Sequence, residues 1–160
     1  MTGCTDSSVG LAYRQLGETI ESLAPQVEAM LQPIAPDEPV TSESESAGYR
    51  FVVPLHFPDG IGVGHVVARL FRYRDTVRVD VEVVHNRMLS KPDGSPSERR
   101  CYLNDFVASI MLAAGTEELP PDFRRGVQRG VLRSRDAVQR HNREEKAPWN
   151  QIRVAALLPS

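Results

Sequence analysis

The chain has 160 residues, of which 41% are hydrophobic and 25% are charged, a composition typical of one globular domain spanning residues 1–160. This composition excludes a mostly disordered chain, and no apolar run approaches the roughly 18 residues of a membrane-spanning helix. The net charge of −2 hides an asymmetry, because residues 1–48 carry eight acidic side chains and only one basic one.

The N-terminus and the cysteines predict the compartment. The first residues, MTGCTDSSVG, lack the basic and then apolar pattern of a secretion signal, so we expect a cytoplasmic protein without a membrane partner. Two cysteines, Cys4 and Cys101, are too few for a disulfide framework, and we interpret both as free thiols. No catalytic or cofactor motif is present, so we expect no enzyme and no cofactor.

A helix is predicted over residues 9–34. Its apolar residues recur at alternating spacings of three and four, and Pro25 predicts a kink near Glu21–Ala24 or a break. The stripe suits packing on the chain's own sheet, or a seam with another subunit. The stripe consists of Tyr13, Leu16, Ile20, Leu23, Val27, Met30 and Ile34.

Residues 32–48 are rich in Pro, Ser and Glu and predict a solvated linker, with residues 1–8 and 35–48 flexible.

Residues 49–85 predict a three-stranded antiparallel meander over Tyr49–Phe57, Ile61–Tyr73 and Thr76–His85. Pairing Val53 with Val66, and Leu70 with Val79, makes one face continuously apolar across all three strands. The same register places Arg69 opposite Asp80 on the other face. Pro54 cannot donate to a ladder and predicts that the first strand is an edge, and the third strand is expected to be the other edge.

The rest of the chain predicts a long loop and two helices. Residues 86–100 are rich in Pro, Gly and Ser and predict a loop, which is followed by a helix from Asn104 or Asp105 to Gly115. A further helix is expected from about Pro120 to Glu144, and alternating apolar residues in the tail after Trp149 could add a fourth strand. The predicted fold class is α+β, with the two C-terminal helices packed on one sheet face.

The last predicted helix has an apolar side and a basic side. Phe123, Val127, Val131, Val138 and His141 cluster on one side at 100° per residue. The basic side could bind phosphates or an acidic protein, or it could be a solvated surface. Together with the basic residues of the predicted 86–100 loop, the basic side of this helix makes nucleic acid an alternative partner. Its arginines are Arg125, Arg129, Arg133, Arg140 and Arg143.

Other chemistry-bearing residues predict structural roles. Asp80 and Glu82 lie on one strand face about 7 Å apart, as in some metal-dependent nucleases, but Arg69 and Arg78 can neutralise them. The histidines show no ligand spacing, and His65 and His85 fall on opposite faces of the predicted sheet, so we expect no metal site.

The order of elements around Tyr49–His85, with a helix before it and two after, resembles the type III secretion chaperone-like superfamily, including its YbjN-related branch. That family usually places further strands between its last two helices, where only Thr116–Leu119 lies in this chain. The resemblance implies a homodimer without catalytic activity that binds a segment of a client protein, which could itself handle nucleic acid.

The sequence therefore predicts a non-enzymatic, chaperone-like adaptor, and the alternative is a nucleic-acid-binding accessory factor in DNA repair or processing. The binding surface expected for a protein client is the mixed face of the sheet, at Val52, Val63, Val67, Arg69 and Phe71.

Overall fold

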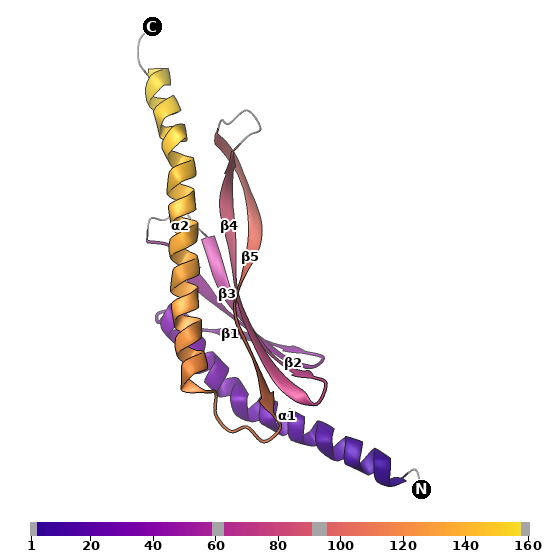
Figure 1. Cartoon of the computed structure of the whole chain (residues 1–160). Helices are drawn as coiled ribbons and strands as arrows, with labels where there is room; N and C mark the ends of the chain where they lie inside the picture. Colours follow the sequence, from indigo (N-terminus) through magenta and orange to yellow (C-terminus); the bar gives the residue numbers. More distant parts are fainter. Residues whose placement is uncertain (1–2, 59–62, 91–95, 158–160) are drawn as a thin grey trace.

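The computed structural model is an α+β fold in which a five-stranded antiparallel sheet carries helices on one face (Figure 1). It describes the backbone of residues 3–58, 63–90 and 96–157, and the side chains of residues 10–58, 64–85, 104–141, 143 and 144. The elements follow in the order α1 (Gly3–Leu31), η1 (Gln32–Ile34), β1 (Thr41–Glu45), β2 (Gly48–His56), β3 (Val63–Tyr73), β4 (Thr76–Ser90), β5 (Pro96–Ala113) and α2 (Pro121–Leu157). The strands lie in sequence order across the sheet.

Helix α1 packs on the chain's own sheet through the predicted apolar stripe. Leu16, Ile20, Leu23, Val27 and Met30 are buried in the core, whereas Tyr13 at the start of the stripe is half exposed. The helix is continuous through Pro25, so the predicted break is wrong, whereas the predicted kink near Glu21–Ala24 stays a prediction. Pro25 lies on the exposed side of the helix, where its ring displaces no core contact.

The predicted register of the meander is confirmed at every predicted pair. Val53 faces Val66, Leu70 faces Val79, and Arg69 faces Asp80. The resulting apolar face is buried under α1 and α2, and its valines and leucines form a single core cluster. The alternation of apolar and polar residues in the three strands was enough to predict this register.

The segment predicted as a linker, residues 32–48, contains the short helix η1 and strand β1. The side chain of Gln32 donates to the carbonyl oxygens of Ala35 and Glu38 at 3.1 and 2.7 Å, which organises the turn after α1. Strand β1 follows and pairs with β2, so the prediction that β2 is an edge is wrong. The β1–β2 pairing ends at the pair Thr41–Val52. Pro54 lies beyond this pair, so its missing backbone N–H costs no hydrogen bond to β1. All five β1 residues are exposed, and the flexibility of residues 1–8 and 35–48 stays a prediction.

Strands β4 and β5 occupy residues 86–90 and 96–100 of the predicted loop, whose residues 91–95 lie outside the described residues, and β5 replaces the predicted helix over residues 104–114. Strand β4 continues to Ser90 and β5 begins at Pro96, so β4 is not an edge. The error at residues 104–114 has a physical cause in a β-bulge. Val81 faces Ala108 and Glu82 faces Phe106, which leaves Val107 as the extra residue. This extra residue disturbs the period of two and creates a spurious helical spacing.

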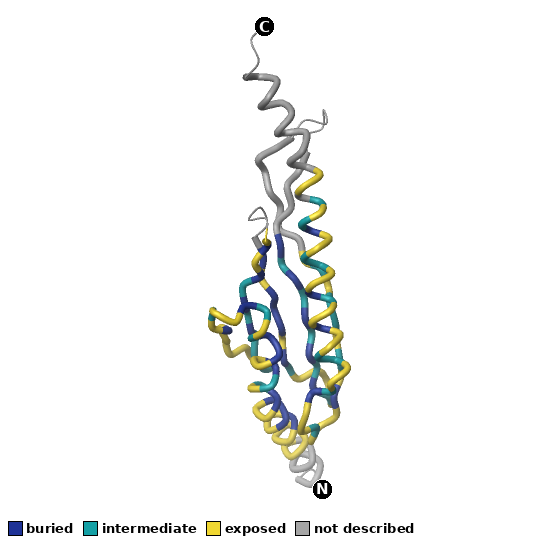
Figure 2. Tube along the Cα trace, turned by 90° about the vertical axis from the view of Figure 1, so that its left-hand side faces the viewer, coloured by how far each residue is buried: buried dark blue, intermediate teal, exposed yellow. Residues whose placement is uncertain are grey.

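Helix α2 begins where the sequence predicts and continues through the tail. Its helical backbone extends to Leu157, so the predicted fourth strand from the tail is wrong, as is the count of two C-terminal helices. Val127, Val131 and Val138 are buried against the same sheet face that α1 covers. Figure 2 shows buried and exposed positions alternating along the described part of α2. No helix in the described ranges is long and apolar enough to span a membrane.

Candidate protein-binding face

The face of the sheet opposite the helices is the candidate site, and we call it the open face. Its residues alternate along each strand with those of the core, so they point away from α1 and α2. Within the described residues no helix packs on it, and Figure 1 shows both helices on the other side. The open face comprises Arg50 and Val52 of β2, His65, Val67, Arg69, Phe71 and Tyr73 of β3, Arg78, Asp80, Glu82 and Val84 of β4, and Phe106, Ser109 and Met111 of β5.

Register partners on the open face form rows that cross the strands. The central row is polar, and two rows with apolar members flank it. Because facing residues on neighbouring strands lie about 5 Å apart, each row is a continuous band of side chains. The central row is Arg50, Arg69, Asp80 and Ser109, and the flanking rows are Val52, Val67, Glu82 and Phe106 on one side and Phe71, Arg78 and Met111 on the other.

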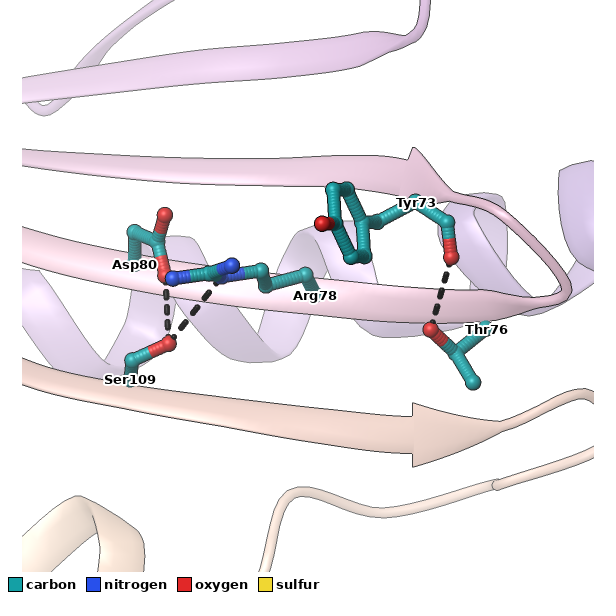
Figure 3. A network of polar contacts seen from close by, with 5 residues as sticks. All are labelled: Tyr73, Thr76, Arg78, Asp80 and Ser109. Atoms are coloured by element: carbon teal, nitrogen blue, oxygen red, sulfur yellow. Dashed lines mark hydrogen bonds and ion pairs between the residues drawn. The ribbon is translucent and has the colours of Figure 1, made fainter.

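The carboxylate of Asp80 is held by two neighbours. Arg78 Nε donates to Asp80 Oδ1 at 2.7 Å, and Ser109 Oγ donates to the same oxygen at 2.5 Å (Figure 3). Arg78 Nε also lies 3.2 Å from Ser109 Oγ. The Arg78 guanidinium stands 5.5 Å from the centre of the Tyr73 ring, within cation–π range. The network fixes Arg78 between Asp80 and the aromatic ring.

The second carboxylate of the suspected pair is also engaged. Glu82 lies 4.0 Å from Arg69 Nη1 and accepts a hydrogen bond of 3.5 Å from Asn104 Nδ2. At the rim, Glu43 of β1 lies 3.9 Å from Arg50 Nη1. Each acid of the open face is thus matched by an arginine, and this favours the structural interpretation of Asp80 and Glu82 over a metal-binding one.

The described histidines do not gather. His65 is exposed on the open face and His85 is fully buried on the core face, as the register predicts. Among the side chains that the structure describes, no three His, Cys, Asp or Glu residues lie close enough to hold a metal ion. The side chains of Cys4 and Cys101 lie outside the described residues, and their interpretation as free thiols stays a prediction.

The structure brings the predicted site residues onto one surface but exposes them unequally. Arg69 is exposed, Val52 and Phe71 are half-buried, and Val67 is only 2% exposed. Val67 lies between its register partners Val52 and Glu82 and, being buried, offers little surface to a partner. The side chain of Val63 lies outside the described residues.

Sequence reasoning missed three exposed residues of the open face. Phe106 is 66% exposed and Met111 is 62% exposed, both on β5, and Tyr73 is 38% exposed at the end of β3. Phe106 and Met111 lie in the segment predicted to be a helix, in which apolar residues would face the core. The sequence gives a weak signal for this strand, because Ser109 separates Ala108 from Ile110 but Met111 breaks the alternation before Leu112.

The basic side of α2 is present as predicted. All five arginines, Arg125, Arg129, Arg133, Arg140 and Arg143, are exposed, on the side of the helix opposite its buried valines. They span 18 residues, or roughly 27 Å at 1.5 Å per residue. Arg125 is paired with Asp122, and Asp136 lies within the same surface. The side chains of Arg87, Arg99 and Arg100 lie outside the described residues.

A polar cluster ties α2 to the sheet on the buried side. His85 Nε2 lies 2.8 Å from Asp105 Oδ2, and Ser134 Oγ donates to the same oxygen at 3.1 Å. A hydrolytic triad places its histidine between serine and aspartate, whereas here the aspartate lies between the other two. With His85 fully buried, this cluster suits fastening of α2 rather than catalysis.

Comparisons of the chain with models of protein families, with curated proteins and with solved structures found no match. The resemblance to the type III secretion chaperone-like superfamily therefore stays a prediction.

Proposed function

We propose that this protein is a non-enzymatic adaptor, chaperone-like in action, that binds a segment of a client protein on the open face. The observation that carries the proposal is a sheet face that no helix covers among the described residues and that presents Val52, Phe71 and Tyr73 between neutralised charges. Apolar patches framed by polar groups are typical of protein-binding surfaces.

The charge pattern of the open face suits a polypeptide better than a small charged substrate. Three arginines and three acids of this face and its rim form close pairs, namely Arg50 with Glu43, Arg69 with Glu82, and Arg78 with Asp80. Paired charges fix the orientation of a bound segment through hydrogen bonds at modest desolvation cost, and the apolar positions between them supply affinity.

The test compares capture of partners by point variants. The tagged protein is incubated with its native lysate after nuclease treatment, and a stoichiometric protein partner is expected with the wild type. Phe71→Asp should abolish capture, because it replaces an apolar contact residue of the open face with a carboxylate, which Arg78 opposite can still accommodate in the fold. Tyr73→Ser provides a second, milder variant.

The matched control is Leu132→Asp, which alters an exposed apolar residue of α2 on the other side of the molecule. It should capture the partner as the wild type does. If the partner is lost with Leu132→Asp and kept with Phe71→Asp at equal thermal stability, the proposal is wrong.

A second candidate function rests on the five exposed arginines of α2, which suit a nucleic-acid-binding accessory factor. Binding to labelled duplex DNA should then weaken with salt, and a plot of log K against log salt concentration should have a slope of about −4.5 if all five arginines contact phosphates. Arg129→Glu combined with Arg133→Glu should remove binding, and Arg74→Glu in the β3–β4 turn should not. Partners that vanish on nuclease treatment would favour this function over the adaptor.

A further inference from the structure

The two edges of the sheet differ in how well they are protected against pairing with another strand. Strand β1 is five residues long and carries two glutamates. Strand β5 forms the other edge, and residues 106–113 contain no charged side chain and no proline. Natural edge strands are usually short, charged or interrupted by proline, because an open edge readily pairs with another chain. The β1 edge follows that rule, whereas β5 carries its proline and charged residues only before position 106.

Apolar side chains remain exposed on both faces of β5. On the open face, Phe106 and Met111 are 66% and 62% exposed. On the core face, Ala108 and Ile110 pack against the core and are only partly buried. Helix α2 therefore does not seal this edge, and a strand added to it would cover apolar surface on both sides of the sheet.

The β-bulge sets the spacing of these residues. Because Val107 is the extra residue between the pairs Val81–Ala108 and Glu82–Phe106, successive open-face positions on β5 are Phe106, Ser109 and Met111. Phe106 and Met111 thus lie one position to either side of Ser109. On the core face, Ala108 and Ile110 also flank Ser109 directly.

We propose that β5 pairs antiparallel with β5 of a second copy of this chain, about a two-fold axis through Ser109. In this register Ala108 of each copy faces Ile110 of the other, and Phe106 of each copy faces Met111 of the other. The strand is self-complementary, since each exposed apolar residue meets one from the second copy, and a two-fold contact closes on itself as a dimer. Sulfur–aromatic contacts between Phe106 and Met111 occur twice.

The arrangement joins the two sheets into one and removes both unprotected edges. It is independent of the proposed client binding, because Phe71 and Tyr73 lie on β3, two strands away from the new junction. Both copies of the open face then lie on the same side of a continuous sheet.

The first test is the mass of the full chain in solution, measured by sedimentation velocity over a range of concentrations. The wild type should be a dimer. Phe106→Lys should raise the dimer dissociation constant at least tenfold, because it places a charge opposite Met111. The monomer should tolerate this change, since Glu82 faces position 106 on β4.

Charge restoration distinguishes loss of the interface from loss of the fold. Adding Met111→Glu to Phe106→Lys should restore the dimer, because the register then forms two Lys–Glu pairs across the axis. Arg78 faces position 111 on β4 and can accommodate the glutamate in each monomer. As a control, Ser44→Lys on β1 should leave the dimer dissociation constant unchanged.

Disulfide trapping tests the position of the axis in a Cys4→Ser, Cys101→Ser background. Ser109→Cys should form a disulfide-linked dimer, since residues that face each other across an antiparallel pair have Cα atoms about 5 Å apart. Ala113→Cys should not, because its two copies would lie roughly 27 Å apart. A monomeric wild type, a dimer insensitive to Phe106→Lys, or equal trapping at both positions would each overturn the proposal.

Discussion

The buried contact between His85 and Asp105 shows how one polar pair can fasten an element. The pair joins β4 to β5, and Ser134 adds α2 to the same carboxylate oxygen. Asp105 faces the core side only because the β-bulge at Val107 reverses the alternation of β5. The sequence could not predict this contact, because its partners become neighbours only once β5 is known to be a strand.

Removing the carboxylate of Asp105 should therefore destabilise the fold. Asp105→Ala takes the acceptor at 2.8 Å away from fully buried His85, and a loss of about 1–3 kcal/mol in the free energy of unfolding is expected. Urea denaturation measures the loss. Asp37→Ala, which removes an exposed acid, should change stability by less than about 0.5 kcal/mol. Equal stability of the two variants would contradict the role given to this contact.

The hydrogen bond from Tyr49 to Glu21 links β2 to α1 at the surface. Tyr49 Oη donates to Glu21 Oε1 at 2.5 Å, and this bond, with smaller contributions from desolvation and the glutamate charge, raises the pKa of Tyr49 above 10.0. A raised pKa in the folded state means that the bond stabilises the fold below about pH 10 and that this stabilisation is lost as the pH rises through the raised value.

The titration of Tyr49 can be isolated by comparing tyrosinate absorbance of the wild type and Tyr49→Phe. Glu21→Gln should return the pKa of Tyr49 towards the ordinary value of tyrosine, because the charged acceptor is removed. A pKa that does not move in Glu21→Gln would show that the hydrogen bond is not its cause.

At the scale of elements, the contact between α2 and the β-bulge depends on a glycine. A Cβ on Gly130 would lie 2.6 Å from Cγ1 of Val107, whereas one on Gly126 would meet nothing within 4 Å. Alanine is favoured over glycine inside a helix by about 1 kcal/mol, but overpacking costs about 1–3 kcal/mol. The same substitution should therefore act in opposite directions one helical turn apart.

Gly126→Ala is expected to raise the free energy of unfolding by up to about 1 kcal/mol, and Gly130→Ala is expected to lower it. Both changes in the free energy of unfolding are measured by chemical denaturation monitored by circular dichroism. Stabilisation by both variants would mean that Val107 moves aside freely and that α2 does not depend on close approach at Gly130.

The elements that sequence reasoning predicted correctly are those with an uninterrupted period. The stripe from Leu16 to Met30 keeps the helical spacing, and β2, β3 and β4 keep strict alternation on both sides of short turns. Strand β5 was missed where its bulge adds one residue, and β1 was missed because its serines and glutamates carry no apolar signal. The predicted placement of Val52, Val67, Arg69 and Phe71 on one sheet face was correct, and the part of that face on β5 was missed for the same reason. The role of this face in binding stays a prediction.

At the scale of the whole molecule, the two faces of the sheet have separate roles in this account. One face holds the core under α1 and α2, and the other presents the open face with its paired charges. The unprotected β5 edge supplies the proposed contact between two copies. Variants of Phe71 should therefore affect client binding and leave the dimer intact, and variants of Phe106 should affect the dimer first.

The central claim, that the open face binds the client, is tested most directly by hydroxyl-radical footprinting of the full chain with and without its captured partner. Oxidation of Phe71 and Tyr73 should fall severalfold in the complex, while Tyr13 on α1 and Leu132 on α2, both exposed on the helix side, should stay as reactive as in the free protein. Protection of Leu132 with unchanged oxidation of Phe71 and Tyr73 would contradict the claim and place the client on the helices.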